Sequence, residues 1–330
     1  MKHFFLSIFV AFFATPTLAF DTCGGENLFD ALPVAEQEHL REIVAQTPYY
    51  QGNIWRATKP GSTVHIIGTL HVPDPRASTT IDTGEALIAQ ADRVFFEVLQ
   101  EDEEYMQLQM STNLELGFID QGPTLPELLT PEEWEQLQDR LKDYGIPPFL
   151  AAKMQPWVLG LTLSMPACFL PALAVRGGID KALLGIADIY DTPMQGLDDI
   201  DDLLALLSSD PIEKQIEDLK LGLTMNGDSE SMFKTTKDLY YSGEHRMLLE
   251  FSKYVLLREN PENAQYLEQA FDEMMYDLLD ARNVKWMEKL LPAIENGTYV
   301  IAVGAGHLSG ELGILQQLEN AGYEVTPYEG

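Results

Sequence analysis

Two apolar runs near opposite ends of the chain are each followed by the same kind of turn. Val64–Thr69 leads into Gly68-Thr69-Leu70-His71, and Tyr299–Val303 leads into Gly304-Ala305-Gly306-His307. Short, almost continuous apolar runs are typical of strands that are buried on both faces of a parallel sheet. In open α/β sheets, ligands bind beyond the carboxyl ends of the strands. The repeated Gly-x-x-His pattern therefore predicts that both ends of the chain build one sheet, with two histidines at the same edge.

The order of the remaining elements predicts an α/β (or α+β) fold. A strand–helix–strand order in the N-terminal part favours a parallel pair of strands joined by a crossover helix. The middle of the chain is mostly helical, so we expect a mostly parallel sheet built from the two chain ends, with a large helical insertion. The expected parts are a signal peptide (1–19), the N-terminal half of the α/β core (20–100), the insertion (101–291) with one core strand near 193–197, and the C-terminal half of the core (292–330).

Individual elements follow from periodicity and turn residues. Expected helices cover Val34–Gln46, Thr80–Ala91 and a C-terminal segment in which Leu308, Leu312, Leu315 and Leu318 recur before Gly322; expected strands cover Asn53–Ala57, Val64–Thr69, Arg93–Val98, Pro193–Leu197, Tyr299–Val303 and Tyr323–Val325.

The N-terminus has the layout of a secretory signal peptide. Lys2 precedes an apolar run over Phe4–Phe13, and small residues around Thr17–Ala19 suit cleavage after Ala19. The apolar run is shorter than the roughly 20 residues of a membrane helix, so an uncleaved anchor is the less favoured alternative. We therefore expect a periplasmic or secreted protein, with no stable membrane span after signal cleavage.

A second long apolar stretch, Trp157–Val175, contains Pro166 and Pro171. Because proline removes a hydrogen bond and kinks a helix, this stretch predicts a broken core helix lining a groove rather than a membrane span. The exported chain keeps Cys23 and Cys168, which could form one disulfide in an oxidising compartment or remain as two buried thiols.

The charge balance excludes nucleic acid as a partner. Lys and Arg total 21 against 52 Asp and Glu, which gives a formal net charge of −31. Such a surface repels phosphate backbones and anionic lipid. The acidic runs Gln100–Glu104 and Asp198–Asp202 are interpreted as solvated helix starts, where carboxylates are favoured by the helix dipole.

Glu97 lies close to the end of the predicted strand Arg93–Val98, so its carboxylate can reach the edge where His71 and His307 lie. Two imidazoles and one carboxylate are a common ligand set for a catalytic divalent metal with a position left open for water. Gly68 and Gly304 would allow the tight turns and the close approach of the backbone to a bound group. The alternative is that each histidine is a hydrogen-bonded structural residue, which is the interpretation we give to His39, His65 and His245.

Several segments resemble the TraB/GumN family. The resemblance rests on Ile66–Val72, Phe96-Glu97, Gly178-Ile179-Asp180, Gln195-Gly196-Leu197, Arg282–Trp286 and Val303–Gly310, and it covers roughly Cys23 to Val325. That family is similar to the Tiki proteins, which are metal-dependent proteases, and more distantly to the erythromycin esterases and ChaN-like proteins. The resemblance implies that His71 and His307 are the motif histidines and Glu97 the motif glutamate. It implies a supporting role for Arg282, which could bind a substrate carboxylate or orient Glu97, unless it is a surface residue.

One departure from the family pattern lies after the strand near 193–197. Many relatives continue with Leu-Glu-Thr, whereas this chain has Leu197-Asp198-Asp199, so Asp198 would have to replace the usual carboxylate with a shorter arm.

Three functions follow as hypotheses. The first is a metal-dependent, peptidase-like hydrolase in which His71, Glu97 and His307 hold manganese, cobalt or zinc and Arg282 assists. The second is a metal-free, esterase-like hydrolase in which His71 is the general base. The third is a non-catalytic accessory protein in surface polysaccharide or pheromone handling. In each case the expected partner is a peptide, a glycan or another small substrate in a groove.

Overall fold

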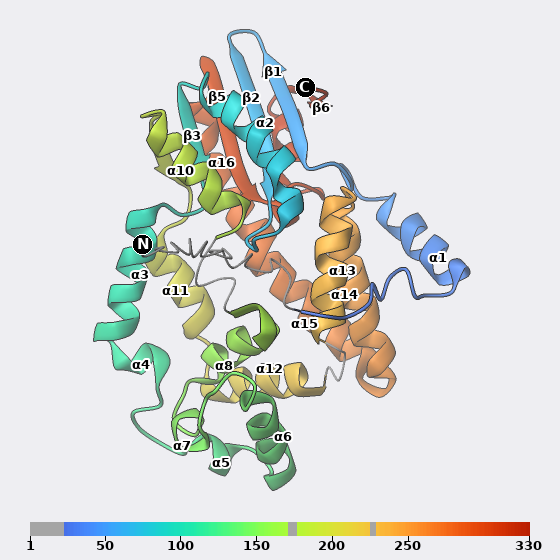
Figure 1. The fold of residues 1–330 in the computed structure, drawn as a ribbon, viewed down its shortest axis with the longest axis vertical. Coiled ribbons are helices and arrows are strands. Elements are labelled where there is room, and N and C mark those ends of the chain that lie inside the picture. Colours follow the sequence, from blue (N-terminus) through green and yellow to red (C-terminus); the bar gives the residue numbers. More distant parts are fainter. Residues whose placement is uncertain (1–22, 171–176, 225–228) are drawn as a thin grey trace, which may run out of the picture.

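The computed structural model describes residues 23–170, 177–224 and 229–330 (Figure 1). The predicted signal peptide, residues 1–19, and the distal part of the apolar stretch, residues 171–175, lie outside the described residues. The protein has an α/β fold in which one six-stranded, mostly parallel sheet is combined with many helices, as the sequence predicts.

The sheet has the strand order β4-β3-β5-β2-β1-β6. Strands β4, β3, β5 and β2 are parallel to one another, whereas β1 runs antiparallel to both β2 and β6. The strands are β1 (Ile54–Lys59), β2 (Ser62–Thr69), β3 (Arg93–Phe96), β4 (Met194–Gly196), β5 (Gly297–Gly304) and β6 (Glu324–Pro327). All six lie where the sequence predicts strands, with shifts of a few residues at their ends.

Strands β2 and β3 are parallel, but the prediction that they pair directly is wrong. Strand β5, from the other end of the chain, is inserted between them. The strand–helix–strand rule fixes the relative direction of two strands but not their adjacency. A central position in the sheet suits a strand that is buried on both faces. In β5, every residue from Tyr299 to Gly304 is buried.

The insertion of β5 brings three strand ends together. Thr69 of β2 is in register with Gly304 of β5, and Phe96 of β3 is in register with Ala302 of β5. The residues that follow these positions therefore leave the sheet side by side.

Helices cover both faces of the sheet (Figure 1). On one face, α2 (Ser78–Ile88) and α10 (Ile179–Ile189) pack Ile88 and Leu183 against Val300. On the other face, α16 (Ala281–Ala293) and α17 (Ile314–Asn320) pack Trp286, Leu290 and Leu315 against Ile66 and Ile301. The result is a three-layer core in which helices cover both apolar faces of the sheet.

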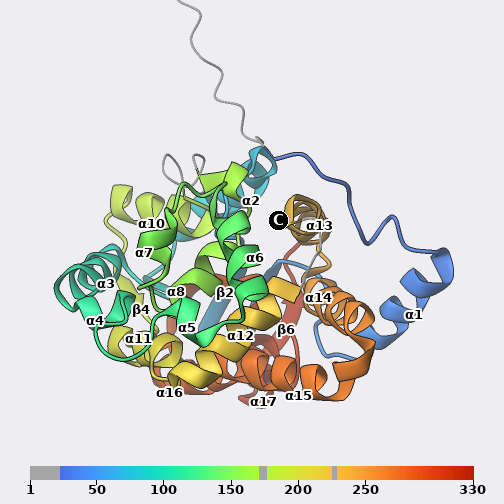
Figure 2. The same cartoon turned by 90° about the horizontal axis from the view of Figure 1, so that it is seen from below.

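The helical insertion lies below the carboxyl ends of the strands in Figure 1 and covers the sheet in the view of Figure 2. One part has its own apolar core, in which Leu137, Leu159 and Leu219 meet. A second part packs the N-terminal segment on a helical pair through Phe29 and Phe251. The helices not yet named are α1 (Val34–Val44), α3 (Gln100–Thr112), α4 (Leu114–Gly117), α5 (Leu125–Leu128), α6 (Pro131–Leu141), α7 (Pro148–Ala151), α8 (Pro156–Leu163), α11 (Ile200–Ser208), α12 (Ile212–Thr224), α13 (Ser229–Tyr241), α14 (His245–Glu259) and α15 (Ala264–Met275), together with the short turns η1 (Pro75–Ala77), η2 (Ala167–Phe169), η3 (Pro261–Asn263), η4 (Tyr276–Asp280) and η5 (Ala305–His307).

The apolar stretch that begins at Trp157 is a broken helix, as predicted for its described part. Helix α8 ends at Leu163, and Pro166 begins the turn η2. Cys168 in this turn forms a disulfide with Cys23, which ties the N-terminal segment to the insertion. Among the described residues, no helix combines the length and the apolar character that a membrane crossing requires.

The C-terminal helix starts later than predicted. The leucine spacing favours a helix from Leu308, but α17 begins only at Ile314. Gly310 has φ +102°, and its N–H donates to the carbonyl of Pro48. That left-handed residue interrupts the helical path, because it requires a backbone conformation outside the α region.

Candidate functional site

His71, Glu97 and His307 converge at the ends of three adjacent strands. His71 follows β2 by two residues, Glu97 follows β3 directly, and His307 lies in the turn η5 that follows β5. Oε1 of Glu97 lies 4.0 Å from Nε2 of His71 and 3.9 Å from Nε2 of His307. The structure therefore brings together the three side chains that the sequence singles out.

The carboxylate of Glu97 is held from two sides. Oε1 accepts the backbone N–H of Gly304 at 2.5 Å, and Oε2 accepts a guanidinium N–H of Arg282 at 2.8 Å. Burial raises the pKa of Glu97, but its electrostatic interactions with the neighbouring His307, His71 and Arg282 and the hydrogen bond from the Gly304 N–H outweigh burial and lower the pKa to about 2. Glu97 is therefore an anion at neutral pH.

His307 is buried and has a defined tautomer. The amide nitrogen of Asn283 donates to the carbonyls of His307 and Leu312, so its amide oxygen must accept the proton on Nδ1 of His307 at 2.7 Å. Burial lowers the pKa of His307 to about 3, which keeps the ring neutral. The ring also packs on Trp286, with centroids 4.3 Å apart. Nε2 of His307 is thus a lone-pair donor that faces the site.

His71 is the accessible member of the group, with 61% of its side chain exposed. Its Nδ1 lies 3.3 Å from Oδ1 of Asp180, an oxygen that has no hydrogen-bond partner among the described residues. Burial lowers the pKa of His71, but the contact with Asp180 and the charge of Glu97 outweigh it and raise the pKa. Asp180 therefore orients the ring while Nε2 turns toward Glu97.

The position of Asp180 follows from a close backbone contact. Helix α10 begins at Ile179, whose N–H donates to the carbonyl of Leu70 at 3.0 Å. A Cβ atom at Gly178 would come within 2.1 Å of that carbonyl, so only glycine fits there. The start of α10 is thereby fixed against the loop that carries His71.

Arg282 is part of the site and not a surface residue. It follows the π-helical turn η4, and such turns are frequent at functional sites. Besides Glu97, its guanidinium binds Asp198 through two contacts of 3.2 and 2.6 Å, and Nη1 lies 3.3 Å from Nε2 of His307. Planar, two-pronged contacts of this kind are the geometry that arginine favours with carboxylates.

Asp198 is buried, and the interpretation of its acidic run as solvated is wrong at this position. Its side chain is 7% exposed and also accepts the indole N–H of Trp286 at 2.8 Å. The next residue, Asp199, has the predicted role, because its carboxylate caps α11 by accepting the N–H groups of Asp201 and Asp202. The run is therefore divided between a buried ion pair and a helix cap.

The two motif glycines have different roles. A Cβ atom at Gly304 would lie 3.1 Å from Oε1 of Glu97 and 3.4 Å from Nε2 of His71, so Gly304 leaves room at the centre of the site. A Cβ atom at Gly68 would instead meet Leu308 at 2.6 Å, so this glycine lets β2 and the turn η5 approach each other. Of the pair, only Gly304 presents its backbone to the reactive side chains.

The donor atoms suit a divalent cation in kind. They are one carboxylate oxygen and two imidazole nitrogens, and the nitrogen of His307 carries a free lone pair. In a tetrahedral site with bonds of about 2.1 Å, donor atoms lie roughly 3.4 Å apart, so the two nitrogens would need to approach Glu97 by about half an ångström. In the described ranges, no set of three His, Cys, Asp or Glu side chains is already arranged as a metal site.

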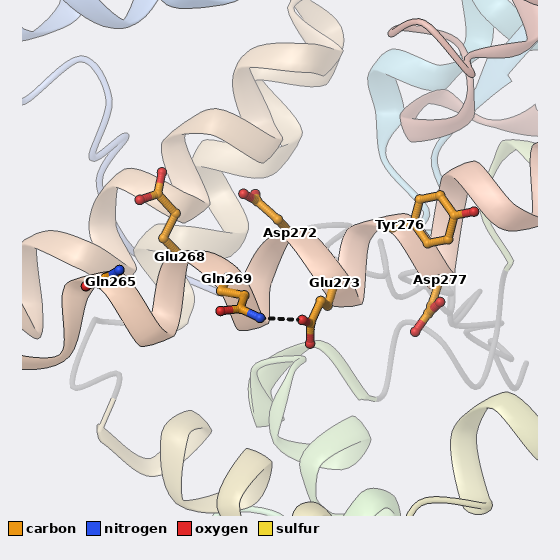
Figure 3. Close-up of a pocket in the computed structure, with 7 residues that line it drawn as sticks. All are labelled: Gln265, Glu268, Gln269, Asp272, Glu273, Tyr276 and Asp277. Atoms are coloured by element: carbon orange, nitrogen blue, oxygen red, sulfur yellow. Dashed lines mark hydrogen bonds between the residues drawn. The ribbon is translucent and has the colours of Figure 1, made fainter.

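Two pockets lie near Arg282. One, of about 500 Å³, is lined by Asp198, Arg282, Trp286 and Lys289 and opens beside the site. The other, of about 630 Å³, lies along α15 and η4 and contains none of the predicted site residues (Figure 3). Its acidic side chains point outward from one helical run, and Lys253 pairs with two of them, so it is a solvated face.

Two residues of the site were not singled out from the sequence as site residues. Asn283 shares a helical face with Trp286, Met287 and Leu290, at the spacing of a buried stripe. A polar residue on such a stripe is the signal that could have identified it. Asp180 follows a glycine pair, which is a weaker signal for a close backbone approach.

Comparisons with known proteins identify the family of this chain. The model of the TraB/PrgY/gumN family matches residues 53–327. The chain is also 27% identical over 270 residues to the uncharacterized protein YbaP of Escherichia coli strain K12, covering 79% of this chain and 90% of that protein. YbaP of Shigella flexneri gives the same identity and coverage. The family match spans all six strands and every residue of the site, and the chain therefore belongs to the TraB/PrgY/gumN family.

Proposed function

We propose that this protein is an exported hydrolase that activates water between His71, Glu97 and His307, with peptide bonds as the preferred substrate class. The proposal rests on one observation above all. Three side chains from distant parts of the sequence meet at the strand ends, and each is held in orientation by a second group. Such preorganisation is costly unless the site is used, because it gathers buried polar groups in one place.

His71, Glu97 and His307 are the residues that would hold a divalent cation such as manganese, cobalt or zinc. A bound cation would supply a water of lowered pKa and polarise the substrate carbonyl. Asn283 keeps the lone pair of His307 directed into the site, and Gly304 and Arg282 keep Glu97 ionised. Arg282 also places positive charge beside the carboxylate, where it can stabilise negative charge that develops on the substrate.

A second candidate, the metal-free hydrolase, is favoured by a specific contact. Nη1 of Arg282 lies 3.3 Å from Nε2 of His307, where it competes with a metal for the same lone pair. In this mechanism the neutral form of His71 takes a proton from water, and Asp180 sets its tautomer, as carboxylates do for catalytic histidines. Because the pKa of His71 is raised to about 9, this form becomes abundant only at alkaline pH, where the metal-free reaction should be fastest. The exposed side chain of His71 is accessible to a substrate from solvent.

Export is supported by the disulfide between Cys23 and Cys168. Such bonds persist in oxidising compartments and are rare where thiols are kept reduced. Together with the signal-like N-terminus, the disulfide supports a periplasmic or secreted location.

The test is elemental analysis combined with turnover. Purified wild-type protein, His307→Ala and the control His39→Ala are compared for bound metal and for hydrolysis of peptide and ester panels, with and without a chelator. The metal-dependent proposal expects wild type and His39→Ala to bind about one metal and to lose activity on chelation, and His307→Ala to lose both. Activity that survives chelation but is lost in His71→Ala would favour the metal-free reaction. A protein that turns over none of these substrates after loading with each of the three metals would contradict both.

A further inference from the structure

A cavity of about 460 Å³ lies within the helical insertion, between α8 and α12 on one side and the pair α13–α14 on the other. This volume falls within the range of pockets that bind small ligands. Most of its wall is apolar, with Leu163, Leu219, Met232, Phe233 and Val255 facing it from four helices. Of the helices that line it, α8 and α12 lie below the strand ends in Figure 1, and α13 and α14 lie to one side of them.

Two glycines on this wall are not explained by packing. Gly160 lies inside α8 and Gly222 lies in the last turn of α12, and neither has a positive φ. Glycine is the least favourable helix residue after proline, so it usually marks a close contact. Here, no atom of the described residues outside the immediate backbone comes within 4 Å of a Cβ built at either position. The glycines therefore leave the cavity open and do not serve the contact between the two helices.

Three of the four hydroxyl side chains on the wall make few demands on an occupant; Ser229, Arg140 and Glu259 form the rest of its polar part. Ser164 donates to the carbonyl of Leu161, Thr236 donates to that of Met232, and Ser252 donates to that of Leu248. Each hydroxyl is satisfied by its own helix, with donor–acceptor distances between 2.7 and 2.9 Å. An occupant can therefore contact their carbon atoms without offering a hydrogen bond in return, which favours an apolar chain over a sugar or a polar peptide.

The cavity is continuous with the loop that carries His71. Val72 lies on the cavity wall and is bonded directly to His71. It also forms a small apolar cluster with Phe169 and Phe233, whose ring centroids lie 4.4 Å apart. The loop that carries His71 therefore contributes an apolar residue to the cavity wall.

We propose that this cavity binds an aliphatic chain of the substrate, either an acyl chain or the aliphatic side chains of a peptide, while the scissile carbonyl lies at His71. This inference rests on the proposed hydrolase function for its biological meaning, but binding of the chain can be measured without turnover. Four methionine and leucine side chains on the wall, Leu163, Met165, Leu219 and Met232, supply the adaptable, apolar contacts that such a chain requires.

The test uses the fluorescent polyene fatty acid cis-parinaric acid as the probe, with the full mature chain. We expect saturable binding to wild type, at least tenfold weaker binding to Gly160→Leu, and unchanged binding to Gly185→Leu. Gly185 is the matched control, because it is an exposed glycine inside α10 whose Cβ would also meet no described atom within 4 Å. A leucine at Gly160 should project into the cavity, obstruct the binding of a chain, and leave the far-UV circular dichroism unchanged.

Competition distinguishes the two sources of the chain. Displacement of the probe by decanoate alone indicates an acyl chain, whereas displacement by N-acetyl-trileucine amide indicates peptide side chains, and either result supports the cavity. Absence of saturable binding to wild type, or equal binding to wild type and folded Gly160→Leu, would overturn the inference. His71→Ala should bind the probe like wild type. If the wild-type protein binds the probe but hydrolyses nothing, the proposed function is contradicted and the cavity assignment stays intact.

Discussion

Replacing Arg282 with methionine should destabilise the protein strongly, because the guanidinium is the shared partner of two buried carboxylates. The side chains of Arg282, Glu97 and Asp198 are only 16%, 13% and 7% exposed. Removing one member of a buried ion pair costs about 3–5 kcal/mol, since the remaining charge stays desolvated. For about 300 ordered residues, this corresponds to a decrease in Tm of roughly 5–8 °C.

The assay is urea unfolding at pH 7 followed by circular dichroism, with Arg258→Met as the matched control. Arg258 pairs with Glu36 at the surface, where the two side chains are 56% and 39% exposed. Exposed pairs contribute about 0–1 kcal/mol, so the control should lose little. If Arg282→Met is no less stable than Arg258→Met, the reasoning about the buried network is refuted.

The pH dependence of the same variant gives a second check. The pKa of Glu97 is lowered to about 2 in the folded protein, below its ordinary value of 4.5. Its ionised form therefore stabilises the wild type above pH 4.5, and this contribution is lost as the pH falls toward 2. Without the guanidinium the pKa of Glu97 should rise, so the stability gap between wild type and Arg282→Met should narrow from pH 7 to pH 4. A gap that widens on acidification would contradict this account.

Three further predictions concern other parts of the molecule. Gly304→Ala should abolish turnover while keeping the fold, because its methyl group would occupy the space between Glu97 and the imidazoles. In the same peptidase assay, the control Gly306→Ala should keep most of the activity. Burial lowers the pKa of His245 from 6.5 to about 4, so the free energy of unfolding should fall by up to about 3 kcal/mol as the pH drops through this interval. Urea unfolding at several pH values should show a weaker pH dependence of stability in His245→Leu, and an unchanged pH dependence would contradict the prediction. Cys23→Ser opens a loop of 145 residues and should lower the free energy of unfolding in urea by about 5 kcal/mol, so an unchanged midpoint would show that the disulfide contributes nothing.

The elements of the sheet could be predicted from the sequence, but their neighbours could not. Val64–Thr69 and Tyr299–Val303 are apolar enough to identify buried strands, and the following glycines mark where each strand ends. Which strand lies at the centre depends on how well each face is covered by helices, which is a property of the whole fold. The strand–helix–strand pattern therefore gave the right direction for β2 and β3 and the wrong pairing.

The part of the site that could be predicted from the sequence consists of the titratable side chains that follow strand ends. His71, Glu97 and His307 each lie just beyond a strand, so topology alone brings them to one edge. Asp180 and Asn283 come from helices, and their contribution depends on which face of each helix meets the sheet. Residue type alone does not distinguish Asp198 from the exposed acids that follow it, and only the comparison with the family pattern singled it out.

The central position of β5 has a consequence for how the protein is made. The strands are synthesised in numerical order, so β2 and β3 are made long before β5, the strand that lies between them in the sheet. Both strands then expose unpaired edges, which are sites of aggregation in newly made chains. Because β5 joins β2 to β3 and brings His307 with it, the parallel part of the sheet and the site are completed in the same folding event.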